Sequence, residues 1–108
     1  MDPDLPEFMI ADVVVPIAGR DAGQLYYVVG CCGDKLLLAN GKDRSLEKTK
    51  QKKRKHADMV LRSETRVAQN LRNGDKVLDS ELRRDLAEIS QELQSNADGG
   101  FKLWQKTT

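Results

Sequence analysis

The first half of the chain alternates short apolar runs with turn residues, a pattern typical of β-strands. Residues 10–18 are rich in β-branched side chains, residues 24–31 form a second apolar run that Gly30 interrupts, and residues 35–39 form a third. The intervening segments hold glycines where tight turns need them: 19–23, 32–34 and 40–41. Three short strands joined by tight turns predict a meander that curls into a small barrel.

Within these strands, alternation assigns side chains to faces. Val13, Val15 and Ile17 share one face of the first strand, and Asp12, Val14 and Pro16 share the other. Pro16 has no N–H to donate, so this strand, or that end of it, is expected at an edge of the sheet. Tyr26 and Tyr27 fall on opposite faces, which predicts one in the core and one outside, where it could stack on a nucleic-acid base. Gly30 predicts a bulge or bend.

Beyond residue 61 the apolar period changes from two to that of a helix. Ser63 is the predicted cap of a first helix that runs through Leu71 and stops at 73–74, and Asp79 or Ser80 is the predicted cap of a second. That second helix carries one apolar stripe at spacings of four, three and four: Leu82, Leu86, Ile89 and Leu93. The prediction is therefore a mainly β fold with appended α: a barrel over residues 8–61, a helical appendage over 62–97, and a flexible tail over 98–108 that holds Trp104.

A dense basic run separates the predicted barrel from the helices. Residues 48–56 hold six of the chain's 18 Lys and Arg residues and no acid, although the formal net charge is only +1. Such runs often contact phosphate, because each cation placed there releases a condensed counterion. The alternative is a solvated, disordered charge run or linker. We expect its first half to be a loop and residues 54–60 to return as a strand that closes the barrel.

The sequence offers little for catalysis. It has no Gly-rich phosphate loop ending in Lys-Ser/Thr, and its single histidine, His56, has no nucleophile or metal cluster near it in sequence. We predict no enzyme activity, no cofactor, no metal and no small-molecule substrate. Cys31 and Cys32 are adjacent, which suits neither a disulfide framework nor a zinc site, and we expect them buried or half-buried in a reducing compartment. An acidic N-terminus unlike a signal peptide and the lack of a long apolar run predict a cytoplasmic protein that binds no membrane.

The segment VVVPIAGRDAGQLYYVVG (13–30), followed by DKLLLANGKDRSLEKTKQKKRKH (34–56), resembles the KOW motif. More narrowly, it is similar to bacterial KOW-domain proteins related to large-subunit ribosomal protein fourteen of the archaeal and eukaryotic type. The likeness covers about half the chain, residues 9–57, and departs at Ala22, where many KOW turns carry Lys. Residues 78–84 resemble a tail found in some of these bacterial proteins. The resemblance implies an SH3-like barrel that binds RNA, often ribosomal RNA.

The predicted function is RNA binding, in association with the ribosome, through the basic run and the rim of the barrel. A lysine-dominated site favours recognition of RNA shape over sequence. The alternative is a protein-interaction adaptor, in which the barrel and the Leu82–Leu93 stripe contact a partner; the stripe's other interpretation is that it docks on the barrel or on the first helix. The predicted RNA-binding residues are Arg20, Lys35, Lys42, Arg44, Lys48, Lys50, Lys52, Lys53, Arg54, Lys55 and His56.

Overall fold

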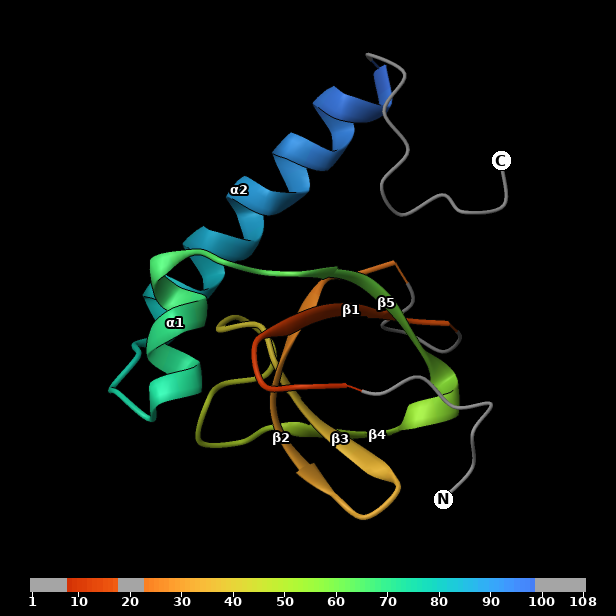
Figure 1. The fold of residues 1–108 in the computed structure, drawn as a ribbon, viewed down its shortest axis with the longest axis vertical. Helices are drawn as coiled ribbons and strands as arrows, with labels where there is room; N and C mark the ends of the chain where they lie inside the picture. Colours follow the sequence, from red (N-terminus) through yellow and green to blue (C-terminus); the bar gives the residue numbers. More distant parts are fainter. Residues whose placement is uncertain (1–7, 18–22, 99–108) are drawn as a thin grey trace.

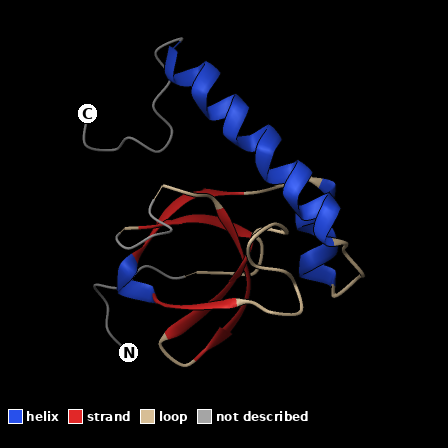
Figure 2. Ribbon diagram, turned by 180° about the vertical axis from the view of Figure 1, so that it is seen from behind, coloured by secondary structure: helices blue, strands red, loops and turns tan. Residues whose placement is uncertain are grey.

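A computed structural model describes residues 8–17 and 23–98 of the chain, and shows one antiparallel sheet of five strands followed by two helices (Figure 1). Figure 2 shows the strands curving around one another, so the predicted fold class, a small barrel-like β domain with appended α, is confirmed. The strand order is β4-β3-β2-β1-β5. The elements are β1 (Asp12–Pro16), β2 (Tyr26–Cys32), β3 (Lys35–Ala39), β4 (Lys50–Lys53), the 3₁₀ turn η1 (Arg54–His56), β5 (Ala57–Arg62), α1 (Arg66–Asn73) and α2 (Asp79–Asp98).

The sheet buries side chains on both of its faces. One face carries Val13 and Tyr27 and packs against the helices, whereas the other carries Val14 and Tyr26 and packs without them. Tyr26 and Tyr27 therefore do point to opposite faces, but both are 0% exposed. The expectation that one of them is free to stack on a base is wrong, because the helices cover the face that would otherwise be solvated.

Pro16 lies within an interior strand, not an edge strand. β1 lies between β2 and β5, which corrects the expectation that the strand itself is at an edge. β2, however, pairs with β1 only at Val13 and Val14, so the Pro16 end of the strand has a ladder partner on one side only, at Ala57. A residue without an N–H is tolerated there because that end extends past the β2 ladder.

The basic run folds differently from the prediction. Lys50–Lys53 forms the edge strand β4 where a loop was expected, and Arg54–His56 forms η1 where a strand was expected; β5 begins only at Ala57. No apolar alternation marks β4 in the sequence. Charged lysines suit an edge strand, however, because its outer side faces water and the charges discourage pairing with another chain.

The two helices pack on the sheet and share its core. Thr65, not Ser63, caps α1, and its hydroxyl accepts the Ala68 N–H at 3.2 Å. The predicted stop is confirmed, since Gly74 ends α1 in the left-handed conformation. The apolar stripe of α2 lies in the same core as Val13 and Tyr27, which agrees with docking on the barrel and leaves no exposed stripe for a partner: Leu82, Leu86, Ile89 and Leu93 are all at least 93% buried.

Asp79 and Ser80, the two caps predicted for α2, are instead the first two residues of the helix itself. The helix begins at Asp79, and the Glu81 carboxylate accepts the N–H of Leu78 at 2.9 Å, just before the first turn. The Asp79 carboxylate instead accepts the N–H of Leu46 at 2.8 Å, from the loop between β3 and β4. Asp79 thus fastens that loop to the start of the helix.

Candidate nucleic-acid interface

The pairing of β3 with β4 decides where the lysines of the basic run lie. Lys35 is directly opposite Lys53, and directly opposed residues of an antiparallel ladder share a face with Cβ atoms about 5 Å apart. Lys50 and Lys52 alternate with Lys53, and therefore lie on the other face of the sheet. They are half-buried opposite the fully buried Leu38 and Leu36, so their aliphatic stems cover apolar surface. The predicted run is thus divided between two faces.

Several basic residues lie close together at one end of the β3–β4 pair, next to η1. The N–H of Arg54 donates to the carbonyl oxygen of Asp34 at 3.0 Å, which holds η1 against the turn between β2 and β3. A shallow hollow there is lined by Asp34, Lys53, Arg54 and Lys55. Lys35 is directly opposite Lys53, one of the residues that line this hollow, and His56 is exposed at the end of η1. We call this group the η1 cluster: Lys35, Lys53, Arg54, Lys55 and His56.

The loop between β3 and β4 holds a second basic group, which we call the loop cluster: Lys42, Arg44 and Lys48. All three are exposed, and Asp43 and Glu47 are interspersed among them. The ladder from Lys35 to Leu38 separates this loop from the η1 cluster by about 10 Å along the strand. Of the residues predicted to share one rim with the basic run, Lys42 and Arg44 therefore lie in one loop with Lys48, the first residue of the run, and Lys35 lies at the opposite end of the hairpin.

The loop cluster rests on a fixed backbone. The side-chain oxygen of Asn40 accepts the N–H groups of Lys42 at 2.9 Å and of Arg44 at 3.0 Å, which closes the predicted Asn40-Gly41 turn. Arg83 of α2 donates to the carbonyl oxygen of Gly41 at 3.0 Å. A Cβ at Gly41 would lie 2.2 Å from the carbonyl oxygen of Asp79, so only glycine allows the loop to approach α2 this closely.

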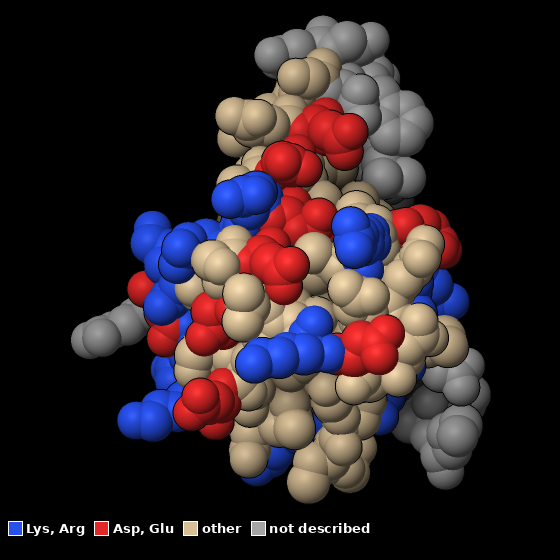
Figure 3. All heavy atoms as spheres, turned by 90° about the vertical axis from the view of Figure 1, so that its left-hand side faces the viewer, with Lys and Arg blue, Asp and Glu red and all other residues tan. Residues whose placement is uncertain are grey.

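The side of the molecule formed by the helices has mixed charge. Figure 3 shows Lys and Arg side chains interspersed with Asp and Glu over this face, without a broad area of one sign. A polyanion would meet carboxylates as well as cations there. Of the two basic groups, the η1 cluster is the better candidate, because Asp34 is the one acidic residue among those that line its hollow.

Part of the predicted site lies outside the described residues. Arg20 is among residues 18–22, which also hold most of the glycine-flanked turn of the KOW resemblance, and Trp104 belongs to residues 99–108. Cys31 and Cys32 are described, and they correct the prediction: both are exposed and carry free thiols. They are at the end of β2, next to the turn that leads to β3.

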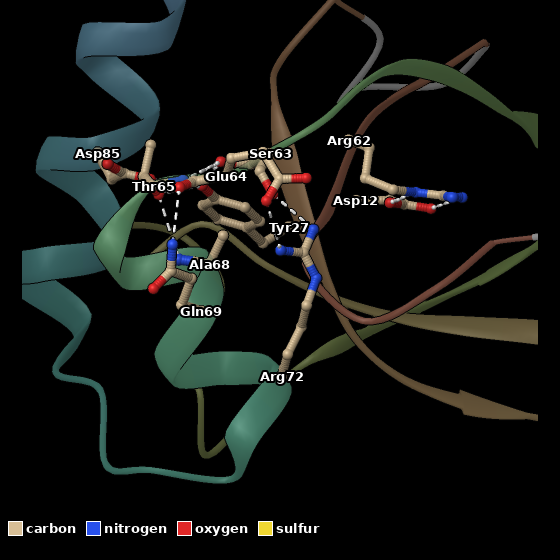
Figure 4. A network of polar contacts seen from close by, with 10 residues as sticks. All are labelled: Asp12, Tyr27, Arg62, Ser63, Glu64, Thr65, Ala68, Gln69, Arg72 and Asp85. Atoms are coloured by element: carbon tan, nitrogen blue, oxygen red, sulfur yellow. Dashed lines mark hydrogen bonds and ion pairs between the residues drawn. The ribbon is translucent and has the colours of Figure 1, made fainter.

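A buried polar network, which the sequence did not reveal, joins the sheet to α2 (Figure 4). The Tyr27 hydroxyl donates to the Asp85 carboxylate, and its oxygen lies 2.9 Å from the Ser63 hydroxyl. The Thr65 hydroxyl donates to the same Asp85 oxygen at 2.9 Å. Arg72 of α1 closes the group by donating to the Ser63 carbonyl oxygen at 2.5 Å. The network links three parts of the chain that are distant in sequence, at Tyr27, at residues 63–72 and at Asp85, so its role is to position the helices.

Burial, and next the hydrogen bond to Asp85, raises the pKa of Tyr27 from its usual value near 10 to about 12. The hydroxyl therefore stays protonated at neutral pH and serves as a donor, not as a base. The one sequence signal for this network is Asp85 itself, three residues after Leu82 and therefore on the inward side of α2.

No protein-family model matches the chain, and no curated protein matches it. Among the described residues, no helix is long and apolar enough to cross a membrane. In the same residues, no group of three or more His, Cys, Asp or Glu side chains is placed to hold a metal ion. The assignment of the chain to the KOW family therefore stays a prediction.

Proposed function

We propose that the protein binds folded RNA, with ribosomal RNA as the first candidate, through the η1 cluster. The observation that carries this proposal is the cross-strand pair of Lys35 and Lys53, which adjoins Arg54 and Lys55 around one shallow hollow. Lys53 and Lys55 are exposed, and Lys35 and Arg54 are half-buried beside them. Each phosphate placed among them releases counterions, which drives binding without any base contact.

The recognition we propose is of backbone and shape. Phe8, Tyr26 and Tyr27, the Phe and Tyr residues in the described part of the chain, are buried, so none of them offers a surface on which a base could stack; the exposed ring at the η1 cluster is that of His56. Lys supplies a mobile point charge, and Arg54 can contact two phosphate oxygens at once. A site of this kind favours duplex or folded RNA over an unstructured single strand, with little sequence preference.

The KOW resemblance supports the same assignment, because the fold it implies, a small β-barrel, agrees with the five curled antiparallel strands. The alternative, a protein-interaction adaptor, needed the apolar stripe of α2 as one of two contacts with a partner, but that stripe lies in the core. Nothing among the described residues favours a protein partner over RNA at the η1 cluster. Association with the ribosome belongs to this proposal and depends on it.

Two variants of equal charge change test the proposal. One replaces Lys35, Lys53 and Lys55 of the η1 cluster by Gln, and the matched control replaces Lys42, Arg44 and Lys48 of the loop cluster by Gln. The affinity of each for a ribosomal RNA hairpin is measured from about 50 to 200 mM salt. If about four phosphates are contacted, the native slope of log affinity against log salt is on the order of −3 to −4.

We expect the η1 variant to lose at least tenfold in affinity and most of its salt dependence, and the loop variant to lose about threefold or less. Circular dichroism spectra that match the native protein establish that both variants are folded. Equal losses in the two variants, or an unchanged slope in the η1 variant, would overturn the proposal.

A further inference from the structure

One thiol lies in the same cross-strand row as two lysines of the η1 cluster. Cys32 of β2 is directly opposite Lys35 of β3, and Lys35 is directly opposite Lys53 of β4. Opposed residues share a face with Cβ atoms about 5 Å apart, so the thiol is one strand from the first ammonium group and two strands from the second. Cys32 is exposed and its thiol is free, so a reagent in solution can reach its sulfur.

The neighbouring cysteine provides an internal comparison. Cys31 is opposite Leu36, which is opposite Lys52, so its row holds an apolar residue where the Cys32 row holds a lysine. Both cysteines are exposed and belong to the same strand end. As neighbours in a strand they point to opposite faces of the sheet, and the row of Cys32 holds two lysines where the row of Cys31 holds one.

We propose that Cys32 is a modification site for anionic low-molecular-weight disulfides, and that the adduct weakens polyanion binding at the η1 cluster. The first part follows from attraction between the anionic reagent and Lys35 and Lys53, which concentrates it at the thiol. Asp34, in the turn between Cys32 and Lys35, offsets part of this attraction, and Arg54 and Lys55 beside it add to it. The second part rests on the proposed RNA binding.

The chemistry is thiol–disulfide exchange. The Cys32 thiol gives up its proton, and its sulfur attacks one sulfur of the disulfide. The original S–S bond breaks as the new bond to Cys32 forms, and the displaced thiolate takes up a proton. With glutathione disulfide as the reagent, the attached tripeptide brings a net negative charge into the row of lysines. A thiol reductant reverses the step and restores the cluster.

The reaction itself is tested without RNA. In Cys31→Ser protein, where Cys32 is the reacting thiol, the rate with the dianionic 5,5′-dithiobis(2-nitrobenzoate) is divided by the rate with the uncharged 4,4′-dithiodipyridine. At low ionic strength we expect this ratio to exceed that of Cys32→Ser protein by about three- to tenfold, and to fall toward it as salt screens the lysines. The further change of Lys35 and Lys53 to Gln should remove the excess. A ratio that these changes leave unaltered overturns the proposal.

The effect on binding is tested by two alkylations of Cys31→Ser protein. Iodoacetate adds a carboxylate to Cys32, and iodoacetamide adds a neutral group of nearly the same size. We expect the carboxymethyl protein to bind the RNA hairpin two- to fivefold more weakly than the carbamidomethyl protein, and the glutathione adduct to bind more weakly still until reductant is added. Equal affinities for the two alkylated forms refute the effect on binding. If the unmodified protein binds no RNA, it is the proposed function that fails, while the reagent ratio still decides whether the lysines act on Cys32.

Discussion

The hydrogen bond between Tyr27 and Asp85 should account for a measurable part of the stability of this small domain. Tyr27 is 0% exposed and Asp85 only 9% exposed, and they join β2 to the middle of α2. A hydrogen bond to a charged group contributes about 1.5–3 kcal/mol net. Replacing Tyr27 by Phe keeps the ring that packs in the core and removes only the hydroxyl, so we expect a loss of about 2 kcal/mol in the free energy of unfolding.

A double-mutant cycle isolates the interaction from its surroundings. Tyr27→Phe, Asp85→Ala and the double variant are unfolded in urea, and the free energies are compared at constant m-value. We expect a coupling energy of about 2 kcal/mol. Glu88→Ala is the matched control, because Glu88 is an exposed residue of the same helix; its coupling to Tyr27→Phe should be within about 0.3 kcal/mol of zero. A Tyr27–Asp85 coupling equally close to zero would refute the role assigned to the network.

Three further predictions concern the fold. Because the folded-state pKa of Tyr27 is raised to about 12, its contribution to stability is present below pH 10 and is lost as pH rises toward 12; pH-dependent unfolding should show a shallower decline in this range for Tyr27→Phe. In urea unfolding, Gly41→Ala should lower the free energy of unfolding by about 3 kcal/mol or more, because the added Cβ would meet the Asp79 carbonyl oxygen. Gly33→Ala is the control: Gly33 also has a left-handed φ, but a Cβ there meets open space, so the loss should be about 1 kcal/mol. Leu82→Ala should cost about 2–5 kcal/mol by the same assay, and a cost below 1 kcal/mol would contradict the docking of α2 on the sheet.

Local signals in the sequence predicted the elements that depend on local physics. The third strand was predicted at its observed bounds, the Gly30 bulge appears as a register shift between Val28 and Gly30, and Gly74 ends α1. Asn40-Gly41 forms its turn, with Gly41 in the left-handed conformation. In each case the side chain or its absence decides the backbone conformation within a few residues, so the pattern alone suffices.

The errors arose where a distant segment decides the outcome. Ser63 looks like a helix cap, but α1 begins later, and Thr65 caps it while both hydroxyls belong to the network around Tyr27. The outward position expected for one tyrosine failed because the helices return to cover that face of the sheet. β4 carries no apolar pattern because it is an edge strand, in which Lys53 is exposed and the aliphatic stems of Lys50 and Lys52 cover apolar surface.

The candidate site was predicted in composition but not in arrangement. Residues 48–56 read as one basic run, yet strand alternation separates Lys52 from Lys53, and the hairpin moves the loop cluster to the opposite end from η1. Lys35, which is 18 residues from Lys53 in sequence, becomes its direct neighbour. The register between β3 and β4 depends on the turn that joins them and on which face of each strand packs on the core. A run of charged residues gives no information about either.

The central claim is that RNA phosphates contact the η1 cluster, and the most direct test is to titrate ¹⁵N-labelled protein with a short RNA hairpin and follow every amide by NMR. The account predicts that the largest shift changes fall on Lys35 and on Lys53 to His56, that they weaken as salt is raised, and that the amides of α2 change little. Shift changes centred on α2 or on the loop cluster, or none at concentrations up to about 1 mM, would contradict it.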